Sequence, residues 1–66
     1  MKLYRLLTDD DTSAFCHKVT KALNAGWDLY GDPQYAPAPS GQMRCAQAVI
    51  KEVPGSYTPD LKLGEQ

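Results

Sequence analysis

The segment from Ala22 to Pro33, which reads ALNAGWDLYGDP, constrains the fold of this chain more than any other part of the sequence. A helical pattern ends there at Gly26, because glycine adopts the left-handed conformation that terminates helices without steric strain. Trp27 follows directly, is the only tryptophan, and opens a run typical of a strand. The segment therefore predicts a helix that reverses into a strand, with the largest apolar side chain at the junction.

Periodicity places three strands and one helix along the chain. The expected strands are Lys2–Thr8, Trp27 to Asp32 or Tyr35, and Met43–Val53. Apolar residues spaced by three and four predict a helix over about residues 11–25. Residues 9–13, which read DDDTS, supply several possible N-caps and place negative charge at the start of that helix. The proline-containing segment 36–41 is expected to be a hairpin loop.

These elements predict an α+β fold with the order β-α-β-β, in which one helix packs on a three-stranded mixed or antiparallel sheet. The third strand carries no charge from Cys45 to Ile50, which favours the centre of the sheet, antiparallel to both neighbours. Residues 1–53 are expected to form the single domain, since a chain this short cannot bury two cores. Residues 54–66 are expected to be a mostly flexible tail.

The two faces of the sheet are assigned from side-chain size. Ala46 and Ala48 are expected beneath the helix, because small side chains allow close approach. The rest of the expected core is Phe15, Val19, Leu23, Trp27 and Ile50. The opposite face would then present Cys45, Gln47 and Val49. One helix covers only one face of such a sheet, so water or a second copy of the chain must meet the other.

Composition argues against several classes of partner. Seven basic and eight acidic side chains give a formal net charge of −1, and no stretch concentrates Lys or Arg. Nucleic-acid binding, which needs a basic face, is therefore not expected. The sequence has neither a signal-peptide pattern nor an apolar run of about 20 residues, so we expect no membrane association and a cytoplasmic protein with reduced thiols.

Candidate chemistry is sparse. Cys16 and His17 are adjacent, but neighbours on a helix point about 100° apart, and Cys16 lies on the apolar stripe as a buried structural thiol would. A disulfide between Cys16 and Cys45 needs both on one side of the sheet, and the face assignment separates them. No spacing of Cys and His is typical of a metal site. We therefore expect no catalytic residue, no metal and no cofactor.

Four motifs together resemble a family of short bacterial proteins classified as domain of unknown function 1737. They are YRLLT from Tyr4, SAFCHKVT from Ser13, ALNAGWDLYG from Ala22 and AQAVIK from Ala46. The resemblance covers roughly residues 3–53. It implies a small α+β domain and no established activity, and it supplies no catalytic residues to transfer.

The function expected from these observations is that of a non-enzymatic interaction domain. It would form a homodimer through its open sheet face or a strand edge, or bind another, unidentified protein. The residues expected on the interaction surface are Cys45, Gln47, Val49, Tyr30 and Tyr35. The alternative is a small-molecule-binding domain that uses a cleft near Trp27, Tyr30 and the 36–41 loop.

Overall fold

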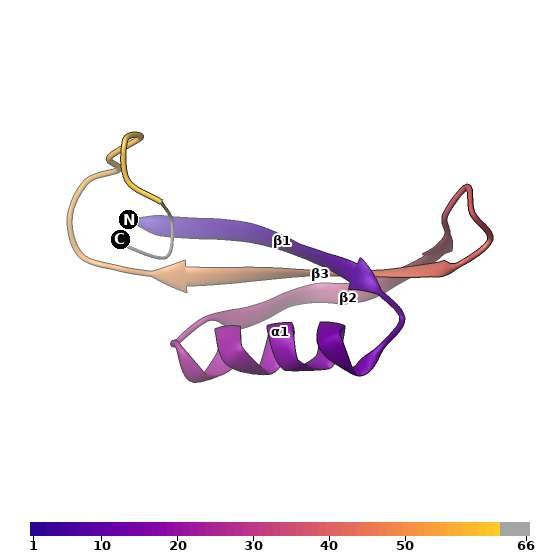
Figure 1. Ribbon diagram of the computed structural model, residues 1–66. Coiled ribbons are helices and arrows are strands. Elements are labelled where there is room, and N and C mark those ends of the chain that lie inside the picture. Colours follow the sequence, from indigo (N-terminus) through magenta and orange to yellow (C-terminus); the bar gives the residue numbers. More distant parts are fainter. Residues whose placement is uncertain (63–66) are drawn as a thin grey trace.

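One helix packs against one face of a three-stranded sheet in the computed structural model, which describes residues 1–62 (Figure 1). The elements are β1 (Lys2–Asp10), α1 (Ser13–Asn24), β2 (Asp28–Pro37) and β3 (Met43–Glu52). β3 lies between β1 and β2 and is antiparallel to both. The predicted fold class, element order and central third strand are confirmed.

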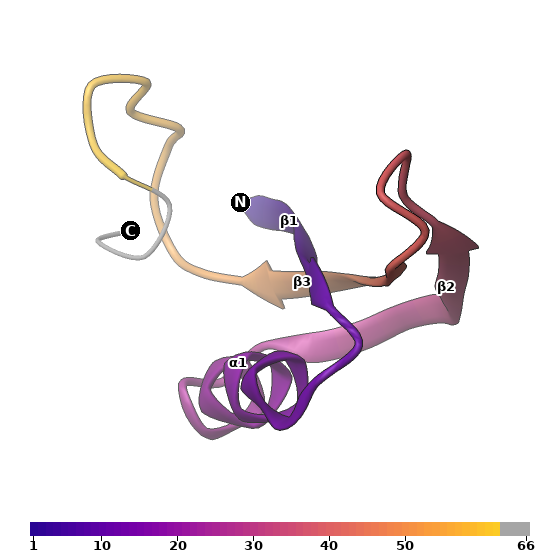
Figure 2. The same cartoon turned by 45° about the vertical axis from the view of Figure 1, so that its right-hand side comes forward.

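The segment after β3 forms neither helix nor strand within residues 53–62. It rises on the side of the sheet away from α1 (Figures 1 and 2). The expectation of a flexible tail over 54–66 stays a prediction, and its last residues, 63–66, lie outside the described part of the chain.

Helix α1 begins at a threonine cap and not at the aspartates. The Oγ1 atom of Thr12 accepts a hydrogen bond from the backbone N–H of Ala14 at 3.3 Å, as N-cap side chains do. The first turn of α1 contains no acidic residue. Thr12 is one of the N-caps predicted within residues 9–13. Capping by the aspartates is wrong, because β1 continues through Asp10, pairing Asp9 with Cys45 and Asp10 with Arg44.

The end of α1 confirms the predicted glycine stop. The N–H of Trp27 donates to the carbonyl of Ala22 at 3.1 Å, and the N–H of Gly26 donates to the carbonyl of Leu23 at 3.1 Å. Gly26 has a φ of +96°. This pair of bonds is the Schellman arrangement, which commonly brings an apolar contact between the third residue from the end and the second residue beyond it. Here those residues are Ala22 and Trp27, and both belong to the core.

The core is small. Its buried apolar members are Leu3, Leu7, Ala22, Trp27, Val49 and Val53. Val19 packs against this cluster, as predicted, and Phe15 is half-buried. Leu23, which was also expected in the core, is 41% exposed.

The predicted face assignment of β3 is inverted. Val49 is fully buried and Gln47 is buried on the side of α1, whereas Ala46, Ala48 and Ile50 are half-buried on the opposite face. Because side chains alternate between faces, a phase error of one residue exchanges every side chain of a strand. The error arose because the small side chains of Ala46 and Ala48 were taken as the surface on which the helix packs.

A bulge in β2 explains why glutamine lies inside. Gly31, Asp32 and Pro33 lie between the pairs Tyr30–Ala48 and Gln34–Ala46, so three residues of β2 oppose the single residue Gln47 of β3. Such an irregularity interrupts the ladder and leaves backbone groups without strand partners. The Nε2 atom of Gln47 donates to the carbonyls of Tyr30 and Gly31, each at 3.3 Å. The buried amide thus replaces the ladder bonds that the bulge removes.

Candidate functional site

The face of the sheet away from α1, hereafter the open face, is left bare by the helix (Figure 2). Cross-strand partners in an antiparallel sheet point to the same face, so the register defines its members. They are Lys2, Tyr4, Leu6, Thr8 and Asp10 from β1, Arg44, Ala46, Ala48, Ile50 and Glu52 from β3, and Asp28, Tyr30, Gln34 and Ala36 from β2.

The centre of the open face is apolar and recessed. Ala48 on the central strand is flanked by Leu6 on β1 and Tyr30 on β2, which are 54% and 60% exposed. Next to this row, a hollow of about 210 Å³ lies over Ala46. Small residues in the middle and large residues at the margins therefore make a shallow groove along β3. The ion pair between Asp10 and Arg44, at 2.7 Å, closes one end of that groove.

Asp11, between β1 and α1, contacts β2 and β3 on the opposite side of the sheet. Its Oδ2 atom accepts a hydrogen bond of 2.6 Å from the hydroxyl of Tyr35, and its Oδ1 atom lies 3.9 Å from Sγ of Cys45. The hydrogen bond to the carboxylate raises the pKa of Tyr35. Partial burial, followed by the charge of Asp11, raises the pKa of Cys45. A raised thiol pKa lowers the thiolate fraction, which opposes nucleophilic chemistry at Cys45.

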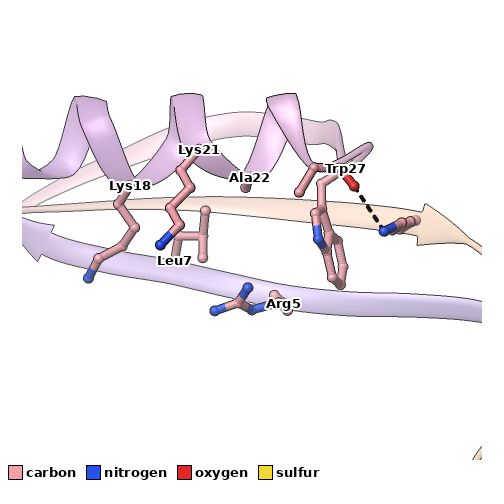
Figure 3. Close-up of a pocket in the computed structure, with 8 residues that line it drawn as sticks. Arg5, Leu7, Lys18, Lys21, Ala22 and Trp27 are labelled. Carbon is pink, nitrogen blue, oxygen red and sulfur yellow. Dashed lines mark hydrogen bonds between the residues drawn. The ribbon is translucent and has the colours of Figure 1, made fainter. Parts of the chain in front are cut away.

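A second concave region lies between α1 and β1, with the edge of Trp27 in its wall (Figure 3). Its volume is about 360 Å³. Its apolar lining is Leu7, Ala22, Ala25 and Trp27, and its charged lining is Arg5, Lys18, Lys21 and Lys51. We call this region the basic cleft.

The four cations of the basic cleft differ in how they are compensated. Lys18 forms an ion pair of 3.2 Å with Asp9 and donates to the carbonyl of Thr8 at 2.7 Å. Lys51 donates to the carbonyl of Ala25 at 2.9 Å, which satisfies a donor without neutralising its charge. Within residues 1–62, Arg5, Lys21 and Lys51 form no salt bridge. Arg5 and Lys51 lie 5.6 and 5.8 Å from the centre of the Trp27 ring, at cation–π distance.

The residues predicted for an interaction surface do not form one surface. Tyr30 lies on the open face, whereas Tyr35 and Cys45 lie on the helix side beside Asp11. The prediction that Gln47 and Val49 belong to an interaction surface is wrong, because both side chains are buried and neither is available to a partner.

The residues predicted to form a small-molecule cleft also lie apart from one another. Trp27 precedes one end of β2, the 36–41 loop lies at the other end, and Tyr30 points to the open face. None of these residues except Trp27 lines the basic cleft.

Sequence reasoning missed the basic cleft because its cations are distributed along the chain. Lys18 and Lys21 are three residues apart in α1, a spacing that places them on one helix face. Arg5 shares a strand face with Leu3 and Leu7. A search for basic residues in phase with core positions would have found the cluster, whereas a search for contiguous basic runs could not.

The two cysteines lie on the same side of the sheet, because Cys45 faces α1; the predicted separation of Cys16 from Cys45 is therefore wrong, although they form no disulfide. Cys16 is exposed and not buried as expected, His17 is exposed, and both Cys16 and Cys45 are free thiols. Among residues 1–62, no group of three or more His, Cys, Asp or Glu side chains is arranged to hold a metal ion.

No helix in the same part of the chain is long and apolar enough to cross a membrane.

Residues 1–52 match the model of the family described as "Domain of unknown function (DUF1737)". The chain therefore belongs to this family, as its motifs indicated. No curated protein matches the chain, and no solved structure does.

Proposed function

We propose that this DUF1737 domain is a non-enzymatic interaction module that pairs two copies of the chain through their open faces. The observation that carries the proposal is the uncovered apolar row Leu6–Ala48–Tyr30 on a sheet whose other face is already occupied by α1. Exposed apolar surface of this kind is typical of contact sites.

The small buried core and the extended shape of the chain support the proposal. The buried apolar core contains six residues, whereas eight large hydrophobic side chains are exposed among those described. The radius of gyration is 13.3 Å, whereas a compact domain of this length is expected near about 11 Å. Domains this small commonly need disulfides, metals or a partner for stability. The two thiols here are free, which favours a partner.

The shape of the open face favours a second copy as that partner. A two-fold interface requires one patch to be complementary to itself. The open face offers both parts of such a contact: protruding Leu6 and Tyr30, and the hollow over Ala46. Its described ion pairs, Asp10–Arg44 and Glu52 with the amino group of Met1, lie at the two ends of the face. The row Leu6–Ala48–Tyr30 itself carries no charge, and Asp28 lies one row away on the edge strand β2. Two copies can therefore meet at this row without burying a charge there.

The described chemistry supports a non-enzymatic role. Cys45 has a raised pKa, and His17, the one histidine of the chain, is exposed on α1. Catalysis needs a nucleophile or base held by an orienting group, and Cys45 and His17 are not so arranged. We also place the domain in the cytoplasm, where free thiols persist.

Sedimentation equilibrium under reducing conditions tests the proposal with two leucine variants. Leu6 on the open face and Leu29 on the helix side are both 54% exposed, so they form a matched pair. Leu6→Asp should weaken the dimer at least about 100-fold, because an unpaired carboxylate would be buried at its centre. Leu29→Asp should change the dissociation constant by no more than about threefold.

Two outcomes of this experiment would contradict the proposal in different ways. A monomeric chain at about 1 mM would overturn the proposal, since even weak specific dimers associate there. A dimer that Leu6→Asp leaves intact would overturn the open face as its interface and point to a strand edge. Circular dichroism of both variants establishes that each retains the native fold.

A further inference from the structure

We propose that the basic cleft is a binding site for a small phosphate monoester that carries an apolar group. This site is separate from the open face and does not depend on dimer formation. The inference rests on the convergence of three uncompensated cations, Arg5, Lys21 and Lys51, beside an apolar wall.

The side chains converge from two elements. Lys18 and Lys21 extend from α1 toward β1, and Arg5 extends from β1 into the same space (Figure 3). Like charges repel, so a cluster of this kind lowers the stability of the unoccupied chain and gains most from an anion. The acidic side chain that contacts the cleft lining, Asp9, is engaged by Lys18 at 3.2 Å. The charges of Arg5, Lys21 and Lys51 are therefore not neutralised by a carboxylate among the described residues.

A phosphate monoester fits this charge better than a carboxylate. At neutral pH its charge is about −1.5 to −2, and it has three acceptor oxygens. A guanidinium offers planar paired donors to such oxygens, and the position of Arg5 beside Trp27 restrains that group before binding. Lys21 and Lys51 can then approach the remaining oxygens as point charges.

The apolar wall and the volume indicate a small organic ligand. Leu7, Ala22 and the edge of Trp27 line the cleft. Its volume of about 360 Å³ lies in the range of sites for small molecules, about 300–1,000 Å³. A nucleic-acid strand needs a basic track that continues along the surface, whereas the neighbouring end of β1 carries the acidic residues Asp9 and Asp10. A phosphorylated small molecule is therefore the occupant that these residues favour.

Phenyl phosphate is the probe for this site, with phenol and benzoate as matched controls. The readouts are the amide shifts of Ala22 and Ala25 and the indole N–H of Trp27 in nitrogen-15 spectra. Phenyl phosphate should bind saturably with a dissociation constant of about 1 mM or tighter. Benzoate should bind at least about tenfold more weakly, and phenol should give no saturable shift.

Variants locate the binding to the cleft. Arg5→Gln and Lys21→Gln should each weaken phenyl phosphate binding about tenfold or more, since each removes a charge-assisted contact. Lys62→Gln, which removes an equal charge outside the cleft lining, should change affinity by less than about twofold. Unchanged spectra away from the cleft establish that the variants are folded.

Three results would overturn the proposal. The first is the absence of saturable shifts at about 10 mM phenyl phosphate, a range in which even weak ligands bind. The second is equal binding by the native chain and both cleft variants. The third is tight binding of a short oligothymidylate with no binding of phenyl phosphate, which would assign the cleft to a nucleic-acid strand.

Discussion

The side-chain amide of Gln47 hydrogen-bonds the backbone carbonyl of Tyr30 across the β2–β3 interface, at 3.3 Å. The same Nε2 atom also reaches the carbonyls of Gly31 at 3.3 Å and Ala48 at 2.9 Å. Gln47 is the one buried polar residue among those described. A side chain here holds an irregular edge strand onto the central strand where the ladder itself is interrupted.

Replacing Gln47 by methionine should destabilise the fold by about 1–3 kcal/mol, because methionine keeps the length of the side chain and removes its donors. The carbonyls of Tyr30 and Gly31 would then lose their contact to β3. Urea denaturation at fixed protein concentration measures the loss. Gln42→Met, in the exposed loop between β2 and β3, should change stability by less than about 0.5 kcal/mol. Equal stabilities of the two variants would contradict the role of Gln47.

Replacing Gly26 by alanine should cost about 1–2 kcal/mol, the typical penalty for an L-residue in the left-handed region. Gly26 has a φ of +96°, and an added Cβ would lie 3.4 Å from Cε of Lys51. Gly26→Asn should cost less than Gly26→Ala, because asparagine adopts this region more readily. Urea midpoints rank the three proteins. A Gly26→Ala variant as stable as the native chain would show that the helix end can re-form without left-handed backbone.

The pKa of Asp9 should be measured below its ordinary value by carboxyl NMR. Its carboxylate accepts a hydrogen bond from the backbone N–H of Asp10 at 2.8 Å, and this contact, followed by the Lys18 ammonium, lowers the pKa. A lowered folded-state pKa means that the stabilisation is present above the unfolded-state pKa and is lost as pH falls through the folded-state value. Lys18→Gln should raise the pKa of Asp9 only in part, since the backbone donor remains. Full return to the ordinary value would show that Lys18 alone causes the shift.

The pKa of Tyr35 should be measured above its ordinary value. The chain contains four tyrosines, and the hydrogen bond from Tyr35 to Asp11 raises the Tyr35 pKa because ionisation would remove the donor. This stabilisation is present below the unfolded-state pKa and is lost as pH rises through the folded-state value. Ultraviolet titration should show a late component that Tyr35→Phe removes. Tyr57→Phe is the control, because Tyr57 is 63% exposed and lies in the segment after β3; it should leave that component in place.

The fold was predictable where local chemistry and global arrangement agree. Gly26 and Trp27 predict the end of α1 and the start of β2, and the helix ends there as expected. The uncharged stretch from Cys45 to Ile50 correctly indicated a central strand, since only such a strand has sheet neighbours on both edges.

The sites were less predictable because each depends on contacts between distant residues. Which face of β3 packs against α1 depends on the burial of Gln47. That burial is favourable only because the bulge at Gly31 leaves a backbone carbonyl to which the amide can donate. The basic cleft depends on the register of β1 and on the packing angle of α1, which together bring Arg5 to Lys21. Neither relationship is encoded in the spacing of residues along a single element.

The bulge of β2 also bears on polymerisation. A further strand cannot pair continuously with an edge that is interrupted at Gly31–Pro33, and the prolines at positions 33 and 37 have no N–H to offer it. The regular outer edge of β1 is then the only one that could accept a strand among the described elements. Two copies joined at β1 would leave only interrupted edges outside. Edge pairing can therefore double the sheet, but it cannot extend the sheet further.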